Sequence, residues 1–403
     1  MNIVFAMDSM KGSLSSMECG MAAAKGLTLA IPDAIYTVRP ISDGGEGTTQ
    51  ALISGLGGVI QNITVHGPLG NPTVAQYGII HMPDKFSDSA KSVPTAIIEV
   101  AAAAGITLVP GDELNPLKST TFGVGEMILD AINEGCRNFI IGLGGSATND
   151  GGIGMLQALG VHFFDINSND MNDEILCGED LQLIKSISLN SLNPILASCT
   201  FEVACDVNNP LFGENGASFI FGPQKGAFEP DIELLDDSMK SFAEISAISI
   251  ISSSSSRYTS TSEIDPYFPG CGAAGGLGFA FHYYLNATLR SGVEIIIDET
   301  NLEKYISQAD IVITGEGRID SQTQMGKTPI GVAKLAKKYN LPVIALAGEI
   351  STDFDGTTIP EIDAYFSILR RTSNNLQAMN REYASKNLTD TSFQIFSLIK
   401  KII

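Results

Sequence analysis

The chain has 403 residues, of which 44% are hydrophobic and 17% are charged, and it contains 41 glycines. At about 150 residues a domain, this length predicts two or three domains, and the apolar content excludes a globally disordered protein. The 45 acidic and 24 basic residues leave a net charge of -21, which disfavours non-specific binding to nucleic acid or to an anionic membrane. An anionic ligand would therefore need local cations, backbone N–H groups or a bound metal ion.

The cysteines and the first residues bear on the cellular compartment. Six scattered cysteines form no C-x-x-C pair and four histidines accompany them, so we expect neither a zinc site nor a disulfide framework. The opening MNIVFAMDS is typical of a buried strand and has no basic region. No apolar run approaches the roughly 18 residues that span a bilayer. We expect a cytoplasmic protein with no membrane partner.

Strand-like and helical patterns alternate at the start of the chain. Residues 2–6 predict a strand, which a helix to about residue 30, a strand over 35–40 and a helix over about 46–54 follow. Ser15 and Glu18 have the spacing of a capping box, so the first helix should begin there. The loop between the first strand and this helix is of the kind that faces ligand in doubly wound sheets.

The pattern changes after Gly55 and returns in the last third of the chain. Gly-Pro and Asn-Pro turns separate short alternating runs there, and the strand-like run TAIIEVA follows. Strand and helix order then resumes, with strands over 309–315, 341–348 and 364–369 and helices over about 329–338 and 393–403. Parallel-sheet character at both ends predicts an α/β fold with an inserted middle domain. The serine-rich residues 251–263 predict a solvated loop.

Small residues, carboxylates, amides and hydroxyls occur together in four glycine-rich segments. These segments are residues 8–13, 42–47, 142–152 and 315–328, and three of them directly follow strand-like runs. Small residues let a ligand approach the backbone, and the polar groups can accept a metal ion or donate to an oxyanion. The four segments together predict a shared polar cleft.

Two near matches to nucleotide-binding motifs leave alternatives open. Gly142, Gly144 and Ala147 fit G-x-G-x-x-A after a strand, and Asp165 follows about 20 residues later, as in a dinucleotide site. Asn149 and Asp150 argue against this site, because they stand where a pyrophosphate would approach. Residues 321–328 end in Gly-Lys-Thr like a Walker A loop but lack its first glycine. The small residues of 270–278 are better explained by helix packing.

Several longer motifs together resemble those of the bacterial type I glycerate kinase (glycerate 2-kinase) family. The motifs are AMDSMKGSLS, SDGGEGT, VHGPLGNP, IIGLGGSATNDGGIGMLQALG, ACDVNNPL, FGPQKGA, PGCGAAGGLG and VITGEGRIDSQTQMGKTPIGVA, in this order over nearly the whole chain. The resemblance implies a Rossmann-like parallel-sheet domain, residues 1–60 and 290–403, with a second mixed α/β domain, residues 61–289, inserted into it. It also implies ATP-dependent phosphorylation of D-glycerate with Mg2+, most often at the 2-hydroxyl, by in-line transfer in an interdomain cleft.

Residue roles follow from what phosphoryl transfer requires, namely positioning, charge neutralisation and a carboxylate that accepts the hydroxyl proton. We expect Lys11 and Ser13 to contact a phosphate or the glycerate carboxylate, and Arg318 to clamp that carboxylate. Asp43, Glu46, Asp206 and Asp320 are the candidates for the Mg2+ ligands and the base, and their roles stay open among them. We favour Asp320 as the base and Asp43 with Asp206 as Mg2+ ligands through water. The remaining expected contacts to substrate or nucleotide are Asp8, Glu46, Gly144, Gly145, Ser146, Asn149, Asp150, Lys225, Glu316 and Lys327.

Two other functions remain open from the sequence. A nicotinamide-dependent hydroxy-acid dehydrogenase would use the Gly142 to Ala147 segment with Asp165. A non-catalytic sugar-acid binding protein would also have two domains and a polar cleft. A homo-oligomer is compatible with the sequence.

Overall fold

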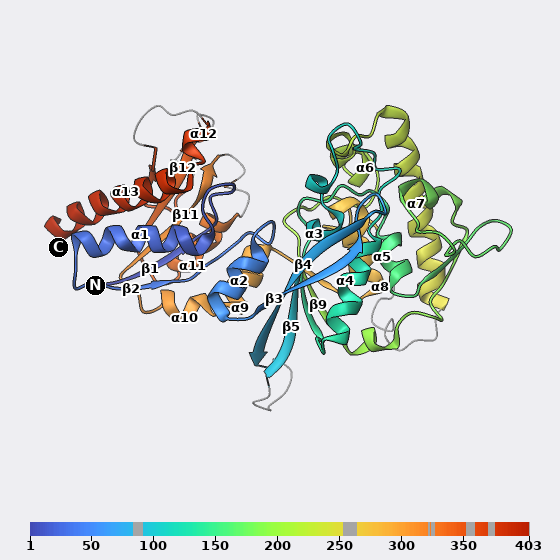
Figure 1. Ribbon diagram of the computed structural model, residues 1–403, viewed down its shortest axis with the longest axis horizontal. Coiled ribbons are helices and arrows are strands. Elements are labelled where there is room, and N and C mark those ends of the chain that lie inside the picture. The colour runs from blue at the N-terminus through green and yellow to red at the C-terminus, as the bar shows by residue number, and fades with distance from the viewer. Residues whose placement is uncertain are drawn as a thin grey trace. The chain divides into compact units, whose positions relative to one another are not determined.

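The computed structural model describes residues 1–83, 92–252, 264–320, 323, 327–351, 359–369 and 375–402. The chain divides into two compact units (Figure 1). Unit 1 contains Met1–Gly57 and Ser291–Ile403, and unit 2 contains Gly58–Arg290. Within the described ranges, no helix combines the length and apolar character needed to cross a membrane.

Unit 1 is built on a five-stranded sheet in the order β2-β1-β11-β12-β13. Its elements are β1 (Asn2–Met7), α1 (Ser16–Ala30), β2 (Ile35–Val38), α2 (Thr48–Leu56), α9 (Gly292–Glu299), α10 (Leu302–Ile306), β11 (Ile311–Ile319), α11 (Thr328–Lys337), β12 (Val343–Ile350), β13 (Ala364–Ser367), α12 (Asn375–Ala378) and α13 (Arg381–Ile402).

All neighbouring strands of this sheet are parallel. The chain passes from β1 to β2 on one side and later returns to place β11 on the other side of β1. The strand order therefore reverses between β1 and β11, and open α/β sheets bind ligands outside the carboxyl ends of their strands at such a point. The loops that follow β1 and β11 begin at this position.

Helices α1 and α13 lie side by side on one face of this sheet (Figure 1). Their backbones approach closely because small residues line the contact: a Cβ on Gly26 would stand 2.3 Å from the carbonyl oxygen of Thr389. The hydroxyls of Thr389 and Ser392 donate to α1 carbonyls, at 2.9 Å to Ala22 and 2.7 Å to Ala23. This packing buries one face of β1, including Phe5, in the core of unit 1.

Unit 2 is built on a six-stranded sheet in the order β10-β9-β6-β5-β4-β3, with a separate pair β7-β8. Its elements are β3 (Val59–His66), β4 (Pro72–Pro83), β5 (Ser92–Glu99), α3 (Ala101–Ala104), η1 (Ile106–Leu108), α4 (Phe122–Asn133), β6 (Asn138–Gly142), α5 (Ile153–Ala158), β7 (His162–Phe164), η2 (Gly178–Leu183), β8 (Ser186–Ser188), η3 (Pro194–Ser198), β9 (Thr200–Ala204), α6 (Ala217–Phe221), η4 (Pro223–Lys225), α7 (Glu229–Ser252), η6 (Ala273–Gly276), α8 (Leu277–Tyr284) and β10 (Thr288–Arg290).

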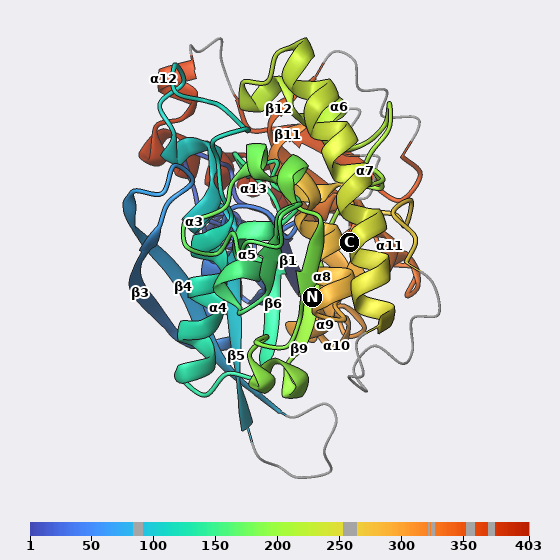
Figure 2. The same cartoon turned by 90° about the vertical axis from the view of Figure 1, so that its right-hand side faces the viewer.

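The strands β5, β6, β9 and β10 of this sheet are parallel, so their carboxyl ends meet at one edge. Successive strands lie next to one another, and Figure 1 shows α3, α4, α5 and α8 on one face of the sheet. Helix α7 lies outside α8 (Figure 2), where the Phe242 and Phe279 rings are 5.8 Å apart. The core of unit 2 lies between the sheet and these helices.

The predicted α/β fold is confirmed, with one parallel and one mixed sheet. The expected capping box is present: the Ser15 N–H donates to Glu18 at 2.9 Å, and the Glu18 N–H donates to the Ser15 hydroxyl. The predicted C-terminal helix is longer than its apolar pattern indicated, because α13 begins at Arg381. The predicted loop over 251–263 was wrong at its start, where α7 continues to Ser252, and its other residues lie outside the described part.

Candidate active site

Asp8 stands directly after β1, at the strand-order reversal of unit 1. Its N–H donates to Gly315 at 2.8 Å, which ties the end of β1 to β11. Its carboxylate accepts from the Thr328 hydroxyl at 2.8 Å and from the Ser9 N–H at 2.6 Å. Burial raises the pKa of Asp8 to about 6, and the nearby charge of Asp43 adds to this shift.

Glu316 is the matching carboxylate on β11. It accepts a hydrogen bond of 2.7 Å from the Thr323 hydroxyl, which in turn accepts from the Asp320 N–H at 3.1 Å. Burial raises the pKa of Glu316 to about 7, and the charges of Asp8 and Asp320 act in the same direction. Asp8, Glu316 and Asp320 therefore form one acidic cluster at the carboxyl ends of β1 and β11.

Cations flank this cluster. Lys327 precedes α11 and acts on the Glu316 carboxylate through its charge. Lys11 is exposed, with its ammonium 4.0 Å from the Asp43 carboxylate. Arg318 is also exposed, lies 3.9 Å from Asp320 and donates to the Ser351 hydroxyl at 3.1 Å.

The other predicted polar residues of this unit lie in the loops after β1 and β2. The Ser13 hydroxyl donates to the Met10 carbonyl at 2.9 Å, inside its own turn. Asp43 accepts from the Gly45 N–H at 3.0 Å, and Glu46 is exposed.

The donor set of unit 1 fits a magnesium ion. Asp8 and Asp43 are close enough for the charge of Asp43 to raise the pKa of Asp8, and a divalent cation would remove that repulsion. Mg2+ prefers oxygen ligands and retains several waters, so two carboxylates with phosphate oxygens suit it. Within the described ranges, no three His, Cys, Asp or Glu side chains form a metal-binding group by themselves.

In unit 2, the predicted loop follows β6 at the carboxyl edge of the sheet. Gly144 and Gly145 are exposed at its tip, whereas Ser146 is buried. The Gly145 carbonyl accepts from Ile106 at 2.8 Å, and the Ala147 N–H donates to Ala104 at 2.8 Å. The loop is therefore anchored on both sides of its exposed tip.

Asp150, at the end of this loop, is fully buried and its carboxylate is occupied by protein donors. It accepts from the Thr121 N–H at 2.8 Å, the Thr121 hydroxyl at 2.7 Å, the Gly152 N–H at 3.0 Å and the Gly154 N–H at 3.3 Å. Burial raises its pKa, and these hydrogen bonds oppose the shift. The structure thus places Asp150 where it holds the start of α5 to the start of α4.

Lys225 and Asn149 are also buried beside the loop. The Lys225 ammonium donates to the Ser146 hydroxyl at 3.0 Å and to the Thr148 carbonyl at 2.6 Å. The Asn149 amide donates to the Ser218 hydroxyl at 2.9 Å, and its buried oxygen has no hydrogen-bond partner among the described residues. Asp206 follows β9 at the same edge of the sheet and is exposed.

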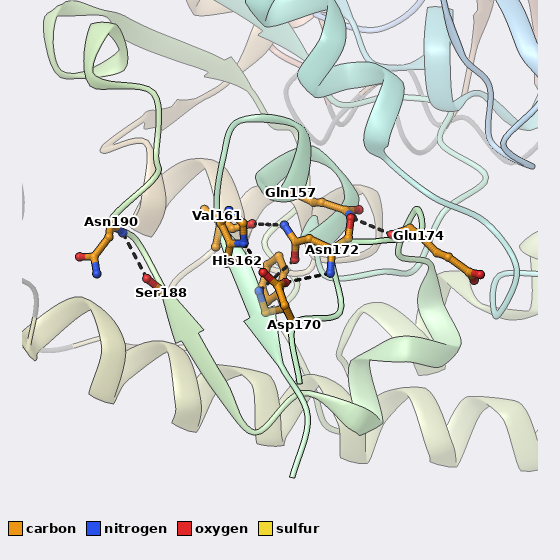
Figure 3. A network of polar contacts seen from close by, with 9 residues as sticks. Gln157, Val161, His162, Asp170, Asn172, Glu174, Ser188 and Asn190 are labelled. Carbon is orange, nitrogen blue, oxygen red and sulfur yellow. Dashed lines mark hydrogen bonds and ion pairs between the residues drawn. The ribbon is translucent and has the colours of Figure 1, made fainter. Parts of the chain in front are cut away.

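The geometry does not support the dinucleotide interpretation of this loop. A ribose-binding carboxylate should follow the next strand of the same sheet. Asp165 instead follows β7, which belongs to the separate two-stranded sheet with β8, and it accepts from the N–H groups of Asn167 and Asn169 in its own turn, at 2.8 Å each. Figure 3 shows the neighbouring polar network, in which His162 bonds Asp170 at 2.7 Å.

Small residues of 270–278 serve close packing against the loop after β6, as the sequence indicated. Gly275 has φ +69°, and a Cβ there would stand 2.1 Å from the Thr148 carbonyl oxygen.

Sequence reasoning missed the hydroxyls that bond the buried carboxylates: Thr328 on Asp8, Thr323 on Glu316 and Thr121 on Asp150. Thr328 ends the Gly-Lys-Thr run, so that motif was a usable signal. Ser321 and Gly326 of the Walker-like segment lie outside the described residues.

Comparison with known proteins decides the family. The model of the glycerate kinase family matches residues 3–400. The chain belongs to this family. It is similar to the glycerate 2-kinase of Escherichia coli (strain K12), 44% identical over 396 residues, which cover 97% of this chain and 98% of that protein. A glycerate kinase of Bacillus subtilis (strain 168) is 44% identical over 92% of this chain and 90% of its own length.

A solved structure agrees with the fold of this glycerate kinase family member. The crystal structure of putative glycerate kinase 2 from Salmonella typhimurium LT2 matches with a TM-score of 0.85 and 42% identity, over 100% of this chain and 98% of that one. The resemblance found in the sequence motifs is therefore confirmed.

Proposed function

We propose that the protein transfers the γ-phosphoryl group of ATP to the 2-hydroxyl of D-glycerate, giving 2-phosphoglycerate and ADP. The acidic cluster of Asp8, Glu316 and Asp320 at the strand-order reversal, flanked by Lys11 and Lys327, is the observation that carries this proposal. Family membership and the name of the Escherichia coli relative support the substrate and the position of transfer.

The chemistry needs few covalent contributions from the protein. The hydroxyl oxygen of glycerate attacks the γ-phosphorus in line, the bond from that phosphorus to the β–γ bridging oxygen breaks, and ADP leaves. The hydroxyl proton passes to a carboxylate, which we assign to Asp320. Its side chain is partly exposed, beside Arg318, so a substrate can reach it.

Charge on the transferred group must be neutralised because the chain as a whole is acidic. Lys11 and Lys327 are the proposed phosphate contacts of unit 1, and Arg318 is the proposed partner of the glycerate carboxylate. Asp8 and Asp43 are the proposed Mg2+ ligands of unit 1, and the metal contact expected of Asp206 in unit 2 stays a prediction. Bound Mg2+ would supply charge stabilisation at the phosphate oxygens. The cleft expected between the two domains stays a prediction.

The first test measures ADP formation from Mg-ATP, dependent on D-glycerate, with the phosphoglycerate isomer identified by phosphorus NMR. L-glycerate and other hydroxy acids serve as alternative acceptors. We expect turnover with D-glycerate and the 2-phosphate as product. Oxidation of hydroxy acids with NAD and no use of ATP would replace the proposal with a dehydrogenase, and stabilisation by glycerate without any product would replace it with a binding protein.

The second test replaces the proposed base. Asp320→Asn should lower kcat by about 10²–10⁴-fold, the usual contribution of a positioned base. Asp310→Asn is the matched control in the same unit, because the Asp310 side chain is 62% exposed. A kcat of Asp320→Asn within tenfold of the wild type would overturn the assignment of the base.

A further inference from the structure

Lys225 is the most buried of the cations predicted to contact a ligand, and its ammonium does not face solvent. Lys225 ends the short helix η4 and only 2% of its surface is exposed. Two of its three ammonium N–H groups donate to the loop after β6, at Ser146 and Thr148, which lie 79 and 77 positions away in the sequence. A direct ligand would need this ammonium to be accessible, so its role has to be sought in the loop that it holds.

The loop presents backbone donors at its exposed tip. Its inward carbonyls are occupied: Gly145 accepts from Ile106, Ala147 accepts from the Ser119 hydroxyl at 3.2 Å, and Thr148 accepts from Lys225. The N–H groups of Gly144 and Gly145 have no hydrogen-bond partner within the described part of the chain. Consecutive free N–H groups on an exposed glycine turn form a concave site for an oxyanion.

The charge of Lys225 lies beneath this tip. Burial lowers the pKa of Lys225 to about 7, and the charge of Asp150 opposes that shift. Asp150 is the charged group that acts on it, and its carboxylate is already occupied by four donors from Thr121, Gly152 and Gly154. Within the described ranges the Lys225 ammonium makes no direct ion pair, and it contacts the loop through Ser146 and Thr148.

We propose that Lys225 is a positioning residue: it holds Ser146 and Thr148 from beneath, so that the backbone of Gly144 and Gly145 keeps the shape that binds an oxyanion of one substrate. This inference rests on the proposed function. The oxyanion is the glycerate carboxylate or an ATP phosphate, which share the same chemistry. Lys225 binds neither of them itself.

The test compares Lys225→Met with Lys185→Met, a matched loss of an exposed lysine in the same unit. We expect Lys225→Met to raise KM for one substrate at least tenfold and to change KM for the other less than twofold. The substrate affected identifies the source of the oxyanion. In the wild type the same KM should rise between pH 6.5 and 8.5, as the ammonium loses its proton, and this rise should be absent in Lys225→Met.

Two further measurements separate positioning from direct binding. Ser146→Ala removes one of the two contacts and should raise the same KM, and the double variant should be no worse than Lys225→Met alone, because both changes act on one element. Amide hydrogen exchange over residues 143–149 should be faster in Lys225→Met and unchanged in Lys185→Met.

The outcomes that overturn the inference are distinct from failure of the proposed function. Additive increases in KM for Lys225→Met and Ser146→Ala would show that Lys225 acts independently of the loop, as a direct ligand. Unchanged amide hydrogen exchange over residues 143–149 would show that Lys225 does not hold the loop. Equal losses for both substrates with no change in pH profile would make its role only structural. If Lys225→Met does not fold, Ser146→Ala and Lys225→Arg replace it in the measurements of KM and of amide hydrogen exchange. Absence of glycerate-dependent ADP formation in the wild type would instead overturn the proposed function, and the exchange experiment would still test the loop.

Discussion

Replacing Asp150 by asparagine tests whether this motif carboxylate holds the fold or binds a ligand. Its two oxygens accept four hydrogen bonds, three from backbone N–H groups and one from the Thr121 hydroxyl. Asparagine keeps one acceptor oxygen, and its NH2 group, which cannot accept a hydrogen bond, replaces the other oxygen. The substitution is almost isosteric, so packing changes little and the hydrogen bonds dominate the result.

The expected loss follows from this count. Oδ2 accepts three of the four hydrogen bonds and Oδ1 accepts only that of Gly152, so an asparagine with its NH2 group at the Oδ1 position sets one pair donor against donor. A hydrogen bond to a charged group contributes about 1.5–3 kcal/mol, and the other three weaken because their acceptor is no longer charged. Removal of the buried charge returns part of its desolvation cost, since burial raises the pKa of Asp150. We expect Asp150→Asn to destabilise unit 2 by about 2–3 kcal/mol, a loss of about 4–12 °C in Tm for a domain of 150–250 residues.

Calorimetry of Asp150→Asn and Asp165→Asn gives a matched comparison. Asp165 also accepts several hydrogen bonds, from Asn167 and Asn169, but it is exposed, so water can satisfy the displaced donors. We expect Asp165→Asn to cost less than about 1 kcal/mol. Equal Tm shifts for the two variants would refute the reasoning. An unchanged Tm with a raised KM in Asp150→Asn would show that Asp150 binds a ligand.

Three further predictions concern packing, capping and pH. Gly275→Ala should destabilise the protein by about 3 kcal/mol, because the new Cβ clashes with Thr148 and the backbone is left-handed. The control Gly213→Ala, at φ +94° with no atom near the new Cβ, should cost about 1 kcal/mol. Equal decreases in Tm for the two variants would contradict the role of the clash. Ser15→Ala removes the cap of α1 and should lower the free energy of unfolding by about 1 kcal/mol in urea titrations, with no change counting against a stabilising cap. Burial lowers the pKa of Lys225 from 10.5 to about 7, so between these two pH values the folded protein binds fewer protons than the unfolded chain. The free energy of unfolding should therefore rise with pH in this range, by about 1.4 kcal/mol per pH unit. Urea titrations at pH 7.5, 8.5 and 9.5 should show this rise in the wild type and not in Lys225→Met, and parallel profiles of the two proteins would refute the prediction.

Features that depend on neighbouring residues could be predicted from the sequence. The capping box of Ser15 and Glu18 involves groups three positions apart, and the apolar runs of β1 and β11 identify buried parallel strands by composition alone. The long motifs also identified the family. These signals are local, so no knowledge of the tertiary contacts was needed to interpret them.

The tertiary structure alone decided which of the motif residues are buried and what they contact. Asp8 and Thr328 are 320 positions apart, and Lys225 is 79 positions from Ser146, yet each pair is joined by a hydrogen bond. Asp150 and Asp165 are both aspartates with an asparagine or glycine within two positions in the sequence, but one is enclosed by four donors and the other lies in an exposed turn. Burial and charge interactions depend on segments that only folding brings together, so the same residue type supports the fold at one position and is open to solvent at another.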